Sequence, residues 1–423
     1  MKKFLTIFLT LVLALSLAAC GVTQSGNSEG KTATSKEKVK ISFINGFTGG
    51  DGPFMKKIVD GFNASQDKYV IEELQTADHY VKFKSDDFDM LIIHADWIST
   101  YHGDGLLREI SDIYQMAGLS VDDFHDIAKT YIQYDDGIFA VPLDLYAFTM
   151  FYNKEFVDEP PKTYADLIAL RDKLDPENTG VYPMAVPLTG DHQWLYMTFL
   201  TQMGVDFVEG EYLKVDTDEA AEALLMLNKL IYEDKLSPAN LGANDHLNAF
   251  MKNVEGNANI QAAIALMGPW NYTAAKERYG DNLGIATIPV LGKTLRVPAG
   301  GHTFAVSAKV KDKDKLEGIA AFFKYAYQPE VMANWADAGQ APIHLKTMEY
   351  VKQNPDKYPV ANVNYTIFDK AEILPAIYNV REQVKFLNSE VYTKVISTPG
   401  LTKEELMPLL AEATKIAKEL SEH

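Results

Sequence analysis

The sequence predicts an α/β protein with mixed, mostly parallel sheets, on two observations. From Lys38 onward, short runs rich in β-branched and apolar residues alternate with stretches of helical periodicity. The chain has 423 residues, of which 47% are hydrophobic and 11% are aromatic, which suffices for two domains of ordinary size and excludes a disordered protein. We therefore expect two hydrophobic cores, each built from strands and their covering helices.

The first part of the chain contains mainly strands. The expected strands are 39–43, 69–72, 90–93, 138–145 and 148–153. Phe54, Ile58 and Phe62 recur every four residues and predict a helix, with Asp51 or a neighbour as its N-cap. Pro142 interrupts the apolar segment around it, and we interpret that segment as a strand crossing between two lobes.

The second part of the chain is mainly helical. The expected helices are 164–174, 194–203, 219–232, 316–327 and 330–338, and the expected strands are 262–267 and 303–307. A last helix should begin at about Thr402, which could form a capping box with Glu405. The chain is therefore expected to end in a helical region.

The N-terminus carries features of export. Lys2 and Lys3 precede an apolar run over 4–17 that is too short to span a bilayer, which is typical of a signal peptide over 1–19. The small residues before Cys20, the only cysteine, resemble the lipobox of bacterial lipoproteins, which implies lipidation of Cys20 and anchoring to the membrane. Segment 20–37 is polar and small, as expected of a flexible tether. The alternative is an ordinary secretory signal with an incidental cysteine.

Composition excludes several classes of function. The net charge of −18 argues against nucleic acid or anionic lipid as a partner. Beyond Cys20 there is no thiol for a disulfide or a nucleophile, and the nine histidines are scattered, which argues against a zinc-binding protein. Phosphate-binding, dinucleotide-binding, nucleophile-elbow and zinc-protease motifs are absent. We expect no cofactor, no metal and no enzymatic activity.

Several sequence blocks together resemble family 1 extracellular solute-binding proteins, the sugar-capturing subunits of ABC importers. They are the lipobox, 45–51, 141–144, 152–154, 267–270 and 339–342. The resemblance implies the two-lobed type II fold of periplasmic binding proteins, with a ligand cleft between lobes that close by a hinge. It places lobe 1 at 38–143 and 299–345 and lobe 2 at 146–296 and 350–423, with crossings near 143–146, 297–300 and 345–349.

Sugars need hydrogen-bonding side chains for their hydroxyls and an aromatic ring against their C–H faces. Three of the four tryptophans have such neighbours, and polar residues follow strand ends or the expected crossings, where ligands of α/β sheets bind. The expected ligand contacts are Thr48, Asp51, Asp96, Trp97, Tyr101, Asp144, His192, Trp194, Trp270, Asn271, His302 and Gln340. Trp335 is expected to pack in the core instead.

We therefore expect a monomeric lipoprotein on the extracellular face of the cytoplasmic membrane that delivers a mono- or oligosaccharide to an ABC permease. One alternative is a binding protein for a polyamine, a metal or an anion. An anion would require arginine in the cleft, and Arg296 is the only arginine near an expected crossing. The second alternative is a secreted glycoside hydrolase, which would require two opposed carboxylates.

Overall fold

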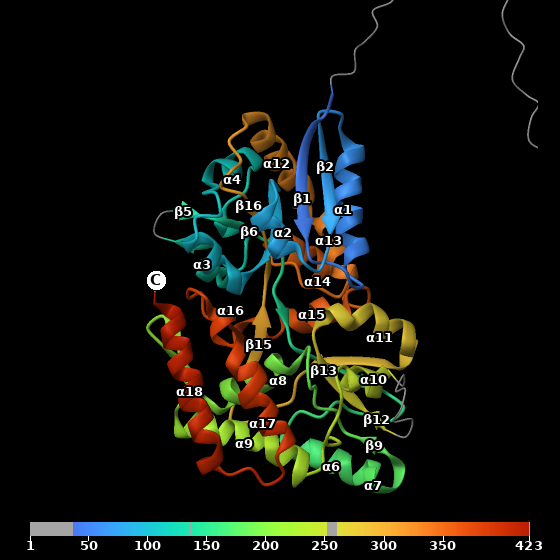
Figure 1. Ribbon diagram of the computed structural model, residues 1–423. Coiled ribbons are helices and arrows are strands. Elements are labelled where there is room, and N and C mark those ends of the chain that lie inside the picture. The colour runs from blue at the N-terminus through green and yellow to red at the C-terminus, as the bar shows by residue number, and fades with distance from the viewer. Residues whose placement is uncertain (1–36, 135–136, 252–259, 423) are drawn as a thin grey trace, which may run out of the picture. The chain divides into compact units, whose positions relative to one another are not determined.

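The computed structural model describes residues 37–134, 137–251 and 260–422 (Figure 1). The expected signal peptide, Cys20 and nearly all of the tether lie outside the described residues. Within the described part of the chain, no helix has the length and apolar character needed to cross a membrane.

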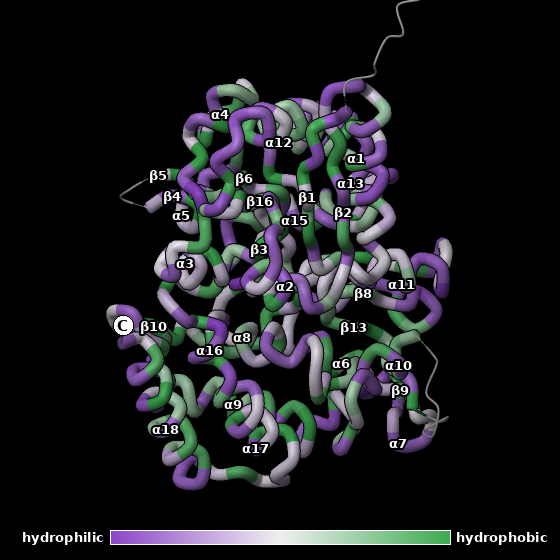
Figure 2. The backbone as a smooth tube through the Cα atoms, turned by 45° about the horizontal axis from the view of Figure 1, so that its top comes forward, coloured by the Kyte–Doolittle hydropathy of each residue, from purple (hydrophilic) through white to green (hydrophobic). Residues whose placement is uncertain are grey.

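The first lobe is built on a five-stranded mixed sheet. Its order is β2-β1-β3-β16-β6, with β1 parallel to β2 and β3, and β16 antiparallel to β3 and β6. The strands are β2 (Tyr69–Gln75), β1 (Val39–Asn45), β3 (Met90–His94), β16 (His302–Val306) and β6 (Ala140–Pro142). All five residues of β16 are buried, and Figure 2 shows hydrophobic residues along β1. The expected strands at 39–43, 69–72, 90–93 and 303–307 are confirmed.

Helices cover this sheet. They are α1 (Gly52–Ser65), α2 (His79–Ser85), α3 (Ala95–Gly103), α4 (Ser111–Ala117), α5 (Lys129–Ile132), α12 (Lys313–Ala326) and α13 (Pro329–Asp337). The apolar faces of α1 and α12 meet where the Phe62 and Phe322 rings pack edge to face at 5.5 Å. A small hairpin joins β4 (Gln133–Tyr134) and β5 (Gly137–Ile138).

The second lobe is built on an antiparallel sheet of order β13-β8-β14. Its strands are β13 (Ile264–Met267), β8 (Thr149–Asn153) and β14 (Leu283–Thr287). The strand expected over 262–267 is divided, because Ala263 separates β13 from β12 (Gln261–Ala262), which pairs with β9 (Val181–Tyr182). A hairpin of β10 (Val208–Glu209) and β11 (Tyr212–Leu213) completes the strands of this lobe.

The helices of the second lobe come from two parts of the chain. They are α6 (Tyr164–Leu174), α7 (Pro176–Thr179), α8 (His192–Met203), α9 (Asp218–Tyr232), α10 (Asp245–Met251), α11 (Tyr272–Tyr279), α15 (Pro359–Tyr365), α16 (Val380–Gln383), α17 (Tyr392–Ser397) and α18 (Lys403–Ser421). The expected capping box of α18 is confirmed, because the Thr402 hydroxyl accepts from the Glu405 N–H and the Glu405 carboxylate accepts from the Thr402 N–H. The Asn228 side chain of α9 donates to the Val395 and Thr398 carbonyls and so ties α9 to the C-terminal helices.

A small sheet of order β17-β15-β7 connects the two lobes. β15 (Val297–Gly300) is antiparallel to β7 (Tyr146–Ala147) and parallel to β17 (Ala371–Ile373). The expected crossing near 297–300 coincides with β15, and the one near 143–146 ends at the first residue of β7. The third expected crossing, 345–349, is helical and begins α14 (Leu345–Lys352), which packs on α13. The residue boundaries of the two lobes stay a prediction.

Candidate functional site

A cavity of about 260 Å³ is lined by residues of both lobes. Its lining residues are Gly46, Phe47, Asp51, His79, Ile92, His94, Tyr146, Trp194, Trp270, His302 and Arg381. Gly46 and His94 lie at the ends of the parallel strands β1 and β3, where ligands of α/β sheets bind. Four of the residues expected to contact ligand, Asp51, Trp194, Trp270 and His302, are thus brought together.

Three aromatic rings form one wall of the cavity. The Tyr146 ring meets Trp194 and Trp270 nearly edge-on, with centroid distances of 5.8 and 5.4 Å. Trp194 lies in the first turn of α8, and Trp270 lies in the turn after β13. Gly268 is required there, because a Cβ atom at this position would lie 2.1 Å from the Trp270 ring. Rings at these angles present both faces and edges, which suits the C–H surface of a sugar.

His302 is held by a buried carboxylate behind the cavity. The Asp144 carboxylate accepts from the His302 backbone N–H at 2.9 Å and from the Trp335 indole N–H at 2.6 Å. The His302 Nδ1 atom lies 2.9 Å from one of its oxygens and 3.1 Å from the other. Asp144 and Trp335 are fully buried, so Asp144 fixes the His302 ring without lining the cavity itself.

His94 is likewise held by a side chain behind the cavity, that of Tyr80. The Tyr80 hydroxyl lies 2.5 Å from His94 Nδ1 and accepts from the His94 backbone N–H at 2.9 Å. The Tyr80 ring packs on Trp97 at 5.0 Å, and the Tyr101 hydroxyl donates to the Tyr80 carbonyl. Trp97 and Tyr101 do not line the cavity. They instead contact the tyrosine that orients His94.

Asp96 also lies behind the cavity, where it forms an ion pair with Arg381. The Arg381 Nε atom lies 2.6 Å from the Asp96 carboxylate, and both side chains are largely buried. Arg381 belongs to α16, which Figure 1 shows between α3 and α18. Arg296 is the only arginine near an expected crossing, but the arginine that lines the cavity is Arg381, which lies near none of them. Arg296 instead forms a half-exposed pair with Glu372.

Asp51 is the N-cap residue of α1, as expected, but its side chain makes no capping hydrogen bond. Its carboxylate accepts from the Gln340 amide, with an N–O distance of 3.5 Å. Burial raises the pKa of Asp51 above the usual 3.8. Gln340 thus lies behind Asp51, as Asp144 lies behind His302.

The remaining expected contacts are not at the cavity wall. Thr48 is exposed in the loop before α1. His192 begins α8 and packs on the Tyr392 ring at 5.4 Å, and Asn271 donates to the Gly268 carbonyl. The structure does not bring these three side chains to the lining of the cavity.

Seven lining residues were not expected from the sequence: Gly46, Phe47, His79, Ile92, His94, Tyr146 and Arg381. Gly46, Phe47 and His94 lay in strand-end segments that the sequence marked, and Tyr146 lay at an expected crossing. His79 and Arg381 had no local signal. His79 is buried with both ring nitrogens unpartnered among the described residues, so it is available to a ligand or a water molecule.

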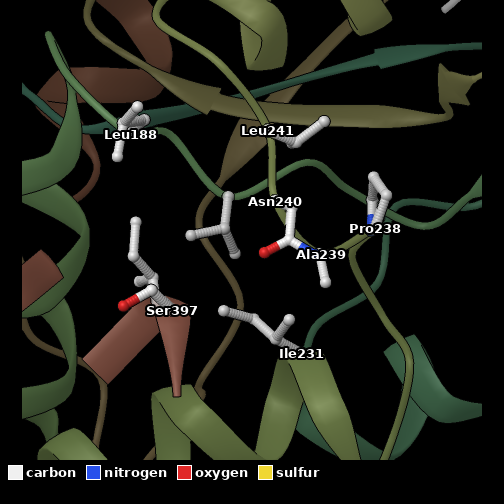
Figure 3. Close-up of a pocket in the computed structure, with 9 residues that line it drawn as sticks. Leu188, Ile231, Pro238, Ala239, Asn240, Leu241 and Ser397 are labelled. Carbon is white, nitrogen blue, oxygen red and sulfur yellow. The ribbon is translucent and has the colours of Figure 1, made fainter. Parts of the chain in front are cut away.

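A second cavity of about 180 Å³ lies within lobe 2 (Figure 3). Of its nine lining side chains, only Asn240 and Ser397 carry a polar group. This cavity offers few hydrogen-bonding partners for a sugar and contains none of the expected contacts.

The Asp144 network generates a prediction for stability. Asp144→Asn would place an amide N–H₂ against donors that only a carboxylate satisfies, so we expect the free energy of unfolding to fall by about 2–4 kcal/mol in urea titrations. Asp87→Asn is the control, because exposed Asp87 pairs with Lys309 at 2.8 Å and its change should be about 0.5 kcal/mol. Equal effects of the two substitutions would contradict this account.

The pKa of Asp51 generates a second prediction, on pH. The protonated form is favoured in the folded state, so stability is lost as the pH rises from 3.8 through the raised folded pKa. Asp51→Asn should therefore be more stable than the wild type at pH 8, and the difference should shrink toward pH 4. Urea midpoints at several pH values measure this. A stability difference between the variant and the wild type that grew as the pH fell would contradict this prediction.

Comparisons with known proteins, like the geometry of the cavity, indicate a solute-binding protein. The family model for "Bacterial extracellular solute-binding protein" matches residues 62–357. The maltotriose-binding protein of Pyrococcus abyssi is 27% identical over 281 residues, which cover 64% of this chain and 58% of that protein. The alignment thus spans less than two thirds of that relative's length.

Two further proteins are similar over more of their length. The maltooligosaccharide ABC transporter solute-binding lipoprotein of Streptococcus pneumoniae R6 is 22% identical over 302 residues, 68% of this chain and 67% of that protein. The maltose-bound MalE3 structure of T. maritima superposes with a TM-score of 0.73 at 18% identity, covering 89% of this chain and 99% of that one. Because the family model matches well over half of its residues, the chain belongs to the family of bacterial extracellular solute-binding proteins.

Proposed function

We propose that this protein captures a neutral oligosaccharide outside the cell, without transforming it, and delivers it to an ABC permease. The observation that carries the proposal is the wall of Tyr146, Trp194 and Trp270, which faces the hydrogen-bonding side chains of the first lobe across one cavity. Aromatic stacking together with convergent polar groups is the usual recognition chemistry for sugars. The names of the two sequence relatives, which refer to maltotriose and maltooligosaccharides, make α-glucans the first candidates.

The charges around the cavity favour a neutral ligand over an anionic one. Arg381 brings one positive charge, but Asp96 already pairs with it. Asp51 adds a carboxylate at the wall, and Asp144 adds another directly behind it. An anionic ligand would thus meet a carboxylate-rich surrounding, although Arg381 is present.

The same residues favour binding over hydrolysis. Glycoside hydrolases of the usual type need two carboxyl groups on opposite sides of the scissile bond. Asp51 is the only carboxylate among the residues that line the cavity, whereas Asp96 and Asp144 lie behind it in fixed pairs. A binding protein needs no second carboxylate.

Ligand capture would be coupled to closure of the lobes. A ligand that contacts walls from both lobes gains its full interaction only when they are close together, so binding shifts the population toward the closed form. We further propose that the closed form is what the permease recognises, and that the protein acts as a monomer. The residue boundaries for the lobes given by the family resemblance belong to this proposal.

The experiment that tests ligand class is a thermal-shift and calorimetry screen of the chain from Gly21 onward. We expect stabilisation by maltose or maltotriose, unchanged after incubation, and none by spermidine, zinc or glycerol phosphate; a ligand at 100 times its Kd adds about 2.7 kcal/mol. Trp270→Ala should weaken binding about 10-fold or more, and Trp270→Phe less, because a ring remains. Tyr350→Ala removes an exposed aromatic ring that does not line the cavity and is the matched control. Stabilisation by the non-sugar ligands alone, or cleavage of the sugar, would refute the proposal.

We also propose that Cys20 carries the lipid that anchors the protein. The relative from Streptococcus pneumoniae is named a lipoprotein, which supports this. Cys20→Ser should move the protein from the membrane fraction to the medium of a bacterial host that processes lipoproteins. Ser25→Ala, in the same segment, should stay with the membrane. Equal fractionation of both variants would contradict anchoring through Cys20.

A further inference from the structure

Two histidine rings lie side by side in the wall of the ligand cavity. His94 ends β3 and His302 begins β16, and the two residues are direct partners in the antiparallel register. Their ring centroids lie 4.7 Å apart. In each ring Nδ1 is already engaged behind the cavity, so Nε2 is the nitrogen that remains for a ligand.

The support of His94 fixes which of its nitrogens carries the proton. The Tyr80 hydroxyl oxygen accepts from the His94 backbone N–H, and its own proton has a single acceptor among the described residues, His94 Nδ1. Nδ1 is therefore unprotonated, and the neutral ring carries its proton on Nε2. Burial lowers the pKa of His94 well below its ordinary value, which keeps the ring neutral.

The Asp144 carboxylate places the proton of the His302 ring on the other nitrogen, Nδ1. One Asp144 oxygen accepts from the His302 backbone N–H and the other from the Trp335 indole N–H, and both of these groups can only donate. The carboxylate is thus an acceptor at both oxygens, and His302 Nδ1 must donate to it. In the neutral ring Nε2 then has a free lone pair and is an acceptor.

We propose that His94 and His302 recognise two neighbouring ligand hydroxyls with opposite polarity, His94 donating from Nε2–H to one oxygen and His302 accepting the proton of the other. This inference rests on the proposed sugar-binding function and assigns which histidine donates and which accepts a hydrogen bond at its site. Tyr80 and Asp144 are positioning residues, because they set the proton location of each ring without lining the cavity. Trp97 and Tyr101 act one step further back, through their contacts with Tyr80.

The protonation pattern is measurable without any ligand. Long-range ¹H–¹⁵N spectra of ¹⁵N-histidine-labelled protein, as the chain from Gly21 onward, distinguish the two neutral tautomers and the charged ring. His94→Gln and His302→Gln assign the two rings among the nine histidines. We expect His94 in the Nε2–H form and His302 in the Nδ1–H form. Identical tautomers, or a doubly protonated His302 at pH 7.5, would overturn the inference.

Tyr80→Phe separates positioning from folding. It removes the hydroxyl but keeps the ring that packs on Trp97, so we expect His94 to populate both tautomers while the rest of the spectrum is unchanged. Tyr232→Phe is the matched control, because its hydroxyl donates to the Ile396 carbonyl on α17, away from the cavity. An unchanged His94 tautomer in Tyr80→Phe would contradict the role given to Tyr80.

The ligand side is tested by calorimetry with maltose and its monodeoxy and monodeoxyfluoro derivatives. Fluorine accepts a hydrogen bond weakly and cannot donate one. At the hydroxyl bound by His94, fluorine should therefore cost less affinity than hydrogen. At the neighbouring hydroxyl bound by His302, both replacements should cost about 3- to 10-fold. Tyr80→Phe should reduce the difference at the first position.

The outcomes separate the two proposals. Maltose binding without this pattern, or with equal tautomers, would overturn the histidine assignment alone. Opposite tautomers in a protein that binds no sugar in the screen would overturn the proposed function, and with it the recognition of hydroxyls.

Discussion

The buried carboxylate of Asp144 is the constraint on which the geometry of the site depends. It lies between β6 and β7, where the chain leaves the first lobe, and it receives hydrogen bonds from β16 and from the indole of Trp335 in α13. A fully buried carboxylate is stabilised only when its oxygens are satisfied by fixed donors. The segments that supply those donors must therefore keep their positions, and the position of the His302 ring at the cavity wall follows from them.

The same design recurs around the cavity, where polar or aromatic residues hold the side chains that line it. Asp96 holds Arg381, Tyr80 holds His94, and Asp144 holds His302. Side chains fixed in this way lose little conformational entropy when a ligand binds, so more of the interaction energy is available as affinity. In the proposed function, residues behind the wall would thus contribute to recognition without being exposed to the ligand.

The division between residues that line the cavity and residues that hold them from behind explains what the sequence could and could not predict. Local signals sufficed for strands such as 39–43 and 90–93 and for the capping box of Thr402, because periodicity and caps act within a few residues, but not for the strand expected over 262–267, which is divided. Asp96, Trp97 and Asp144 were expected at the ligand but lie behind the cavity, because the pairing of aromatic and polar residues in the sequence marks the region of a site without showing which side chains reach its surface. Arg381 could not be found, since it reaches Asp96 only through the packing of α16 between α3 and α18.

Tyr146 would connect the site to the lobe movement proposed above. It lies on β7, in the small sheet that joins the lobes, and its ring contacts Trp194 and Trp270 of the second lobe and His302 of the first. Gly300 on the paired strand β15 leaves room for this ring, because a Cβ atom there would lie 2.4 Å from the Tyr146 hydroxyl. In the proposed closure, a rotation of the lobes about this sheet would change the contacts of Tyr146 with one wall or the other. A ligand packed against Tyr146 would then favour the lobe arrangement in which both sets of contacts are kept, which would couple occupancy of the cavity to the connecting strands.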